Sequence, residues 1–246
     1  RITSMVPVEE YDDKHFILMA TKGGTIKKTV LTEFQNQRKG GKRAITLLEG
    51  DELVGTTVTD GSKFVMLVTN AGKAAHFSET EVRSMGRTAK GVRGIKLDKN
   101  DSVMAMSILN HVEGETDEFR AYLKASSIMR RAKDDTEESI ADEDVSLELS
   151  TERYAELAAK EQIILTVASN GQGKRTSSYE YRLTNRGGKG VISMMLTKSN
   201  SDMVSSFPID ENDEIMLIDD NGQLIRCPVS GIRIMGRNTQ GVKIFN

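Results

Sequence analysis

The stretch Arg87-Thr-Ala-Lys90-Gly-Val-Arg93 is a basic, glycine-containing loop with three further copies in the chain. The copies are Lys39-Gly-Gly-Lys42-Arg-Ala-Ile45, Arg186-Gly-Gly-Lys189-Gly-Val-Ile192 and Arg237-Asn-Thr-Gln240-Gly-Val-Lys243. Counted from Lys42 through Lys90 and Lys189 to Gln240, they lie 48, 99 and 51 residues apart. Self-similarity at such a spacing is typical of repeat proteins built from one supersecondary unit.

A second, unrelated pattern recurs with the same spacing. Gly24, Gly72, Gly171 and Gly222 each follow an apolar run, and they too are 48, 99 and 51 residues apart. Glycine supplies the positive φ that a tight hairpin turn needs. Two independent patterns with one spacing predict repeats of about 50 residues, with one extra piece between the second and third.

Each repeat contains several short strand-like runs. An apolar run precedes each hairpin glycine, and alternating strands are predicted at Leu53–Val58, Val103–Ile108 and Met203–Phe207. About four strands per repeat favour an all-β, propeller-like disc of four-stranded blades. We expect one domain over 1–246, with blades at 14–61, 62–110, 162–212 and 213–246. Residues 1–13 match the end of a preceding blade, so the chain is expected to be a fragment of a longer protein.

The extra piece, 111–161, is predicted to be an acidic, partly helical insertion. From Asn110 to Gln162 there are 15 Asp/Glu against 7 Lys/Arg. Helical spacing is seen at Phe119, Tyr122, Leu123 and Ser126, and again at Tyr154, Leu157 and Ala158, where Ser150 could cap the helix. The insertion, in which the run 134–144 is strongly acidic, is either a solvated surface excursion, or an acidic arm that competes with the ligand of the basic loops or docks a partner.

Signals for catalysis, metals and membranes are weak. The one cysteine, Cys227, excludes an intrachain disulfide and fits a reducing compartment, and there is no membrane-spanning run or signal peptide. The chain has neither a P-loop nor a nucleophile elbow, and its three His are scattered. We therefore expect no catalytic residue, metal or cofactor, and a cytoplasmic location. His76 occupies the repeat position of Lys28, Arg175 and Arg226, which favours a rim residue over a catalyst.

Charge is segregated by sign, although the net charge is only −2. Four windows, 34–48, 82–97, 181–200 and 221–246, contain no Asp or Glu but hold 17 of the 34 Lys/Arg. A surface that is merely soluble mixes both signs, so a basic patch in every repeat predicts binding to a polyanion. Glycine-rich loops leave backbone N–H groups open to phosphates. No base-reading motif is present, which predicts contacts to backbone and shape.

The residues predicted to contact DNA lie in and beside the basic loops. They are Lys27, Lys28, Arg38, Lys39, Lys42, Arg43, Lys73, Arg83, Arg87, Lys90, Arg93, Lys174, Arg175, Arg182, Arg186, Lys189, Arg226, Arg233, Arg237 and Lys243.

The repeats resemble the C-terminal domain of bacterial DNA gyrase A. The resemblance rests on 23–34, 84–95, 173–176, 189–193 and 235–242, and it covers nearly the whole chain outside 111–161. It implies a β-pinwheel that wraps double-stranded DNA with a fixed hand and presents it for strand passage, favouring negative supercoiling. It also implies that the remainder of gyrase A and, through it, gyrase B are partners, that the domain is monomeric and nucleoid-associated, and that cleavage and ATP hydrolysis lie elsewhere.

Alternatives remain at this point. The related domain of topoisomerase IV is one, and a propeller-like protein-interaction scaffold is another; an enzyme centred on the repeats has no support in the sequence. The family's basic box reads Gln-Arg-Arg-Gly-Gly-Lys-Gly, and Gln37–Arg43 matches it at five of seven positions. Residues 37–43 are either this box or an internal loop, with the box in an upstream blade.

Overall fold

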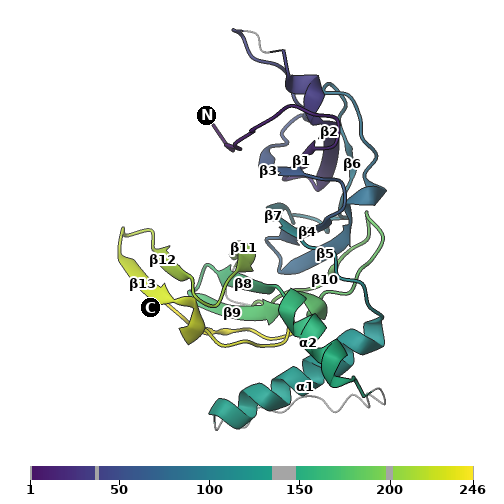
Figure 1. The fold of residues 1–246 in the computed structure, drawn as a ribbon. Helices are drawn as coiled ribbons and strands as arrows, with labels where there is room; N and C mark the ends of the chain where they lie inside the picture. Colours follow the sequence, from purple (N-terminus) through teal and green to yellow (C-terminus); the bar gives the residue numbers. More distant parts are fainter. Residues whose placement is uncertain (1, 37–38, 135–147, 198–201, 246) are drawn as a thin grey trace.

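The structure is a computed structural model that describes residues 2–36, 39–134, 148–197 and 202–245. Within them, three four-stranded sheets and one two-stranded sheet follow one another along an arc (Figure 1). The predicted acidic run falls largely on 135–147, which lies outside the described residues. Residues 2–15 contain no strand, and Ile2 and Met5 within them are exposed.

The first sheet shows how each blade is built. Strands β1 (Phe16–Thr21) and β2 (Thr25–Val30) form an antiparallel hairpin, and β3 (Leu53–Thr59) pairs with the other edge of β1. The hairpin turns at Gly24, where φ is +81°, and the equivalent Gly72, Gly171 and Gly222 also have positive φ. This confirms the turn predicted from the glycine spacing.

The next sheets repeat this arrangement. The second contains β4 (Phe64–Thr69), β5 (Lys73–Ser78) and β7 (Val103–Leu109). The third contains β8 (Ile163–Ala168), β9 (Gln172–Ser177) and β11 (Met203–Ile209). The fourth is the hairpin β12 (Glu214–Ile218) and β13 (Leu224–Pro228). The 3-10 turns η1 (Leu31–Phe34), η2 (Glu79–Glu81), η3 (Ser178–Glu180) and η4 (Val229–Gly231) follow the hairpins and precede the basic loops.

The outermost strand of each four-stranded sheet comes from the following repeat. Strand β6 (Val92–Arg93) pairs with β2, β10 (Val191–Ile192) pairs with β5, and β14 (Val242–Lys243) pairs with β9. The expectation that each repeat folds into its own blade is therefore wrong for this strand. Its N–H and C=O groups find their partners on the open edge of the preceding hairpin, which would otherwise remain unpaired.

The sheets stack face to face around three apolar clusters. Leu18, Ile26 and Val65 lie in the cluster between the first and second sheets, and Met66 and Ile164 lie in the next. The third cluster joins Leu165, Val167, Val229 and Ile232. Because each cluster draws residues from two sheets, the stack buries apolar surface that a single blade would leave exposed.

The insertion forms two helices docked on the third blade. They are α1 (Thr116–Asp134) and α2 (Thr151–Lys160), and the Ser150 hydroxyl caps α2 by accepting from the Arg153 N–H at 3.2 Å, as predicted. Leu157 is buried as expected, whereas Ala158, predicted on the same face, is exposed. The blade contributes Tyr179, whose ring stacks on Phe119 with centroids 4.6 Å apart.

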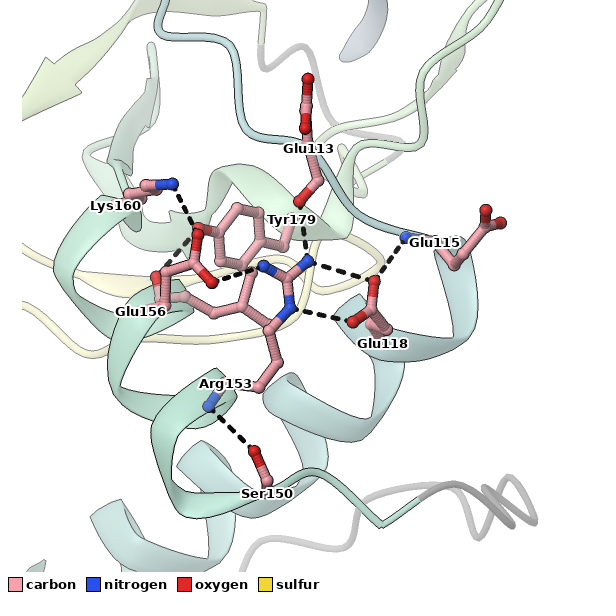
Figure 2. Close-up of polar contacts among 9 residues, drawn as sticks. Glu113, Glu115, Glu118, Ser150, Arg153, Glu156, Lys160 and Tyr179 are labelled. Carbon is pink, nitrogen blue, oxygen red and sulfur yellow. Dashed lines mark hydrogen bonds and ion pairs between the residues drawn. The ribbon is translucent and has the colours of Figure 1, made fainter.

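Arg153 ties the two helices together (Figure 2). Its guanidinium donates to both carboxylate oxygens of Glu118 at 2.9 and 3.1 Å, to Glu156 at 2.7 Å and to the Glu113 carbonyl at 2.8 Å. A planar guanidinium suits such paired acceptors. The hydrogen bond from Arg153 holds the pKa of Glu118 below its usual range. Within the described part of the insertion, α1 and α2 thus form a folded unit with a defined place on the third blade.

Candidate nucleic-acid interface

The basic loops are held against the preceding sheet by a repeated glycine. Gly91, Gly190 and Gly241 stand just before β6, β10 and β14, with φ of +98°, +72° and +79°. A Cβ at these positions would lie 2.7, 2.5 and 2.7 Å from backbone carbonyl oxygens of Ile26, Ala74 and Gly173. Only glycine fits both the left-handed backbone and the close approach. The Gly-Val pair in the repeated motif therefore marks the point where each loop joins its neighbour.

Three equivalent arginines link consecutive loops. Arg87 donates to the Arg43 carbonyl at 3.3 Å, Arg186 donates to the Arg93 carbonyl, and Arg237 donates to the Ile192 carbonyl at 3.2 Å. Each bond runs from one basic loop to the loop before it. These arginines thus fix the spacing of neighbouring loops.

Backbone hydrogen bonds strengthen the same links. The Gly187 N–H donates to the Gly94 carbonyl at 2.8 Å, and the Met195 N–H donates to the Thr239 carbonyl at 2.9 Å. The joining strands β6 and β10 lie on the convex side of the arc, opposite β3, β7 and β11 (Figure 1). The loops therefore form one connected row along the outside of the stack, which we call the basic rim.

Several predicted residues project from the basic rim as exposed cations. Within the described residues, no ion pair is found for Lys39, Arg43, Arg83, Lys90, Arg93 and Arg182. Arg233 occupies the position equivalent to Arg83 and Arg182, and it is also exposed. The six cations without an ion pair keep their full attraction for an anion, because no neighbouring carboxylate offsets it.

Other predicted residues are engaged by nearby groups. Lys73 pairs with Asp98, which also lies 3.8 Å from Lys189, and the Lys73 hydrogen bond lowers the pKa of Asp98. Arg226 pairs with Glu214 across the β12–β13 hairpin. Two lysines donate to carbonyls: Lys42 to Glu33 at 3.3 Å and Lys243 to Asn170 at 2.8 Å. Arg38 lies outside the described residues.

Two predicted lysines are buried inside the stack. Lys174 is 0% exposed, and its ammonium donates to the carbonyls of Gly236, Arg237 and Thr239 at 2.7–3.0 Å. Lys27, also 0% exposed, donates to the carbonyls of Ala44 and Arg87. Burial lowers the pKa of Lys174 to about 7, and burial followed by the Arg87 charge lowers that of Lys27 to about 8. Both ammonium groups donate to backbone carbonyls on the buried side of the basic loops, so these lysines are not available to DNA.

The repeat position shared by Lys28, His76 and Arg175 is buried as well. Lys28 donates to the Glu79 carbonyl at 2.9 Å, Arg175 donates to the Ile232 carbonyl at 2.6 Å, and His76 Nδ1 lies 2.7 Å from the Tyr181 carbonyl oxygen. Each bond crosses to the next blade. The interpretation of His76 as a rim residue is therefore wrong, and Lys28 and Arg175 serve packing between blades.

The described residues contain no helix long and apolar enough to cross a membrane, and no group of three or more His, Cys, Asp or Glu placed to hold a metal ion.

Comparison with known families accounts for the repeats. The sequence profile described as "DNA gyrase C-terminal domain, beta-propeller" matches this chain at residues 15–60, 63–110, 162–216 and 213–246. The chain belongs to this family. Its matches leave the insertion uncovered between the second and third repeats.

Relatives in the gyrase family agree with this assignment. The DNA gyrase A protein of Haemophilus influenzae is 40% identical over 247 residues, which cover 100% of this chain and 26% of that protein. The DNA gyrase A protein of Salmonella typhimurium is 40% identical over 242 residues, covering 98% of this chain and 22% of that protein. The chain thus spans about a quarter of the length of the curated relatives it matches.

Two solved structures share the fold. The C-terminal domain of DNA topoisomerase IV aligns with a TM-score of 0.72 at 21% identity, covering 98% of this chain and 60% of that one. The DNA gyrase A C-terminal domain aligns with a TM-score of 0.67 at 19% identity, covering 96% and 63%. These likenesses confirm the predicted all-β pinwheel of four-stranded blades.

One set of basic residues near the basic rim was not predicted from the sequence. Arg120, Lys124 and Arg130 lie on α1 and line a groove beside the third and fourth repeats. They were hidden because the insertion is acidic as a whole. Counting the charges of α1 alone, without the acidic run that follows it, could have identified them.

Proposed function

We propose that this chain binds duplex DNA along the basic rim, without sequence preference, and bends it around the stack. The observation that carries this proposal is the connected row of loops, which expose cations that form no ion pair within the described residues, Lys90, Arg93 and Arg182 among them. Phosphate contacts position DNA without reading sequence, and glycine-rich loops allow close approach.

Several loops acting together are needed for bending. Curving 20–30 base pairs by 40–90° costs on the order of 1–6 kcal/mol. One loop would hardly supply this, whereas loops held at fixed spacing by Arg87, Arg186 and Arg237 present a curved row of phosphate sites. The DNA would follow the convex side of the arc in Figure 1.

In the whole protein, we propose that the wrapped segment is presented for strand passage and so favours negative supercoiling. The support is membership of the gyrase A family, and the remainder of gyrase A and then gyrase B are the proposed partners. The proposed role of this chain is non-catalytic, in the cytoplasm at the nucleoid, with the isolated domain a monomer. Cleavage and ATP hydrolysis are assigned to other parts of the enzyme.

The DNA-binding proposal is tested by removing rim charge. Lys42→Ala, Lys90→Ala and Lys189→Ala should each weaken binding to a duplex and flatten its salt dependence, because each lost phosphate contact lowers the slope of log K against log salt by about 0.9. Lys160→Ala on α2 is the matched control. Unchanged slopes in the three rim variants would reject the proposal, and no binding at low salt would favour an interaction scaffold.

A further inference from the structure

The insertion places a basic helix opposite the basic rim. A groove of 1560 Å³ runs between α1 and the loops of the third and fourth repeats. Arg120, Lys124 and Arg130 line it from α1, and Arg182, Arg233 and Arg237 line it from the loops. Figure 1 shows α1 running alongside the third blade.

Three acidic residues line this groove, against seven lysines and arginines. Glu211 pairs with Arg175. Burial raises the pKa of Glu180, and the charges of the nearby Arg237, Lys174 and Arg130 oppose this rise. Glu113 holds Arg153 through its backbone carbonyl alone, and its carboxylate points away from that guanidinium, so it keeps its negative charge (Figure 2). The groove therefore keeps an excess of positive charge, although the insertion as a whole is acidic.

Two of the helix cations are available to a ligand. Within the described residues Lys124 and Arg130 form no ion pair with a carboxylate, whereas Arg120 pairs with Asp117 at 3.1 Å. The position of α1 is set by the Phe119–Tyr179 stack and by the Tyr179 hydroxyl, which donates to the Leu157 carbonyl at 2.9 Å. Tyr179 stands three residues before Arg182. Tyr179 therefore holds α1 close to the loop that contains Arg182, and both elements line the same groove.

We infer that α1 is a second contact for the DNA bound on the basic rim, with Lys124 and Arg130 touching the phosphate backbone across the groove from Arg182. This rests on the proposed function and extends it beyond the repeats. Charge complementarity favours a phosphate backbone as the occupant, because fixed cations on both walls would lie along one polyanionic strand. The insertion then widens the DNA-contact surface at the third blade.

The test is a salt titration of the full chain with a duplex of about 40 base pairs, long enough to span several loops. In the Lys124→Ala/Arg130→Ala double variant, loss of two phosphate contacts should lower the salt slope by about 1.8 and weaken binding roughly tenfold at moderate salt. Lys124→Arg/Arg130→Lys should restore both. Lys160→Ala, a change on α2 outside this groove, should leave both unchanged, and melting curves of all variants report whether the insertion stays folded.

The outcomes separate this inference from the function on which it rests. A lower slope in Lys90→Ala with an unchanged slope in the α1 double variant would overturn the inference and leave rim binding intact. Unchanged slopes in both would reject the basic rim as the DNA-binding surface, and with it the proposed function. Tighter DNA binding by the double variant would overturn the inference in another way, because the groove would then hold an acidic protein segment that competes with DNA.

Discussion

Lys174 stabilises the packing of the fourth basic loop against the third blade. Its ammonium is fully buried and faces three backbone carbonyls and the Thr239 hydroxyl. In Lys174→Met those oxygens lose their donor, and a buried polar group without a partner costs about 1–3 kcal/mol. We expect the free energy of unfolding to fall by about 2–4 kcal/mol in denaturant melts. Lys90→Met, the same change at an exposed site, should be near neutral, and equal losses in both would contradict this role.

His76 should make the domain sensitive to acid. Its Nε2 is buried without a partner while Nδ1 faces the Tyr181 carbonyl, so protonation would bury an unpaired N–H; burial lowers its pKa below 6.5. The unfolded chain therefore binds the proton more readily, and stability is lost as pH falls below 6.5, by at most about 1.4 kcal/mol per pH unit. Chemical denaturation at pH 7 and pH 5 should show a smaller loss in His76→Gln. Equal losses would mean that His76 titrates normally.

At the scale of the element, the exchanged strand depends on one glycine in each loop. Gly190→Ala places a Cβ 2.5 Å from the Ala74 carbonyl oxygen at a φ of +72°, so β10 should separate from β5. We expect a loss of about 1–3 kcal/mol in stability, with faster amide exchange in β5. Gly86→Ala is the control, because nothing lies within 4 Å of its Cβ position. Protection of β5 in Gly190→Ala equal to that of the native chain would contradict this account.

The sequence predicted the elements that depend on local signals. The hairpins at Gly24, Gly72 and Gly171 follow from glycine spacing and apolar runs, and these cues act within a few residues. The exchange of β6, β10 and β14 could not be predicted, because each strand has only two residues and its partner lies in the preceding repeat.

Part of the candidate site could not be predicted from the sequence either. Lys27 and Lys174 have the same local signature as surface lysines, and only the stacking of the next blade buries them. The exposed cations Lys90 and Arg182 were predicted because a stretch of sequence without Asp or Glu can be recognised without knowledge of the tertiary structure. The basic face of α1 was concealed by the acidic residues that share its insertion.

At the scale of the whole molecule, we propose that the row of loops bends DNA as a unit. If 6–10 phosphates are contacted, affinity should fall about 10³–10⁵-fold between 50 and 200 mM salt. Arg186 donates to the carbonyls of both Arg93 and Glu81, and substituting it with Lys removes this fork of donors while keeping the charge. We expect this variant to bind DNA nearly as tightly as the native chain but to bend it less, as measured by energy transfer between dyes at the duplex ends. A native degree of bending would show that the loop links do not set curvature.

Wrapping on the basic rim can be tested directly through the linking number of closed-circular DNA. Relaxed circles are bound to this chain at several salt concentrations and treated with a nicking–closing enzyme, and their linking number is then measured. Chiral wrapping on the basic rim predicts a shift in linking number that falls steeply with salt and is reduced in the combined Lys42→Ala, Lys90→Ala and Lys189→Ala variant. Binding without any shift in linking number would contradict wrapping by these blades.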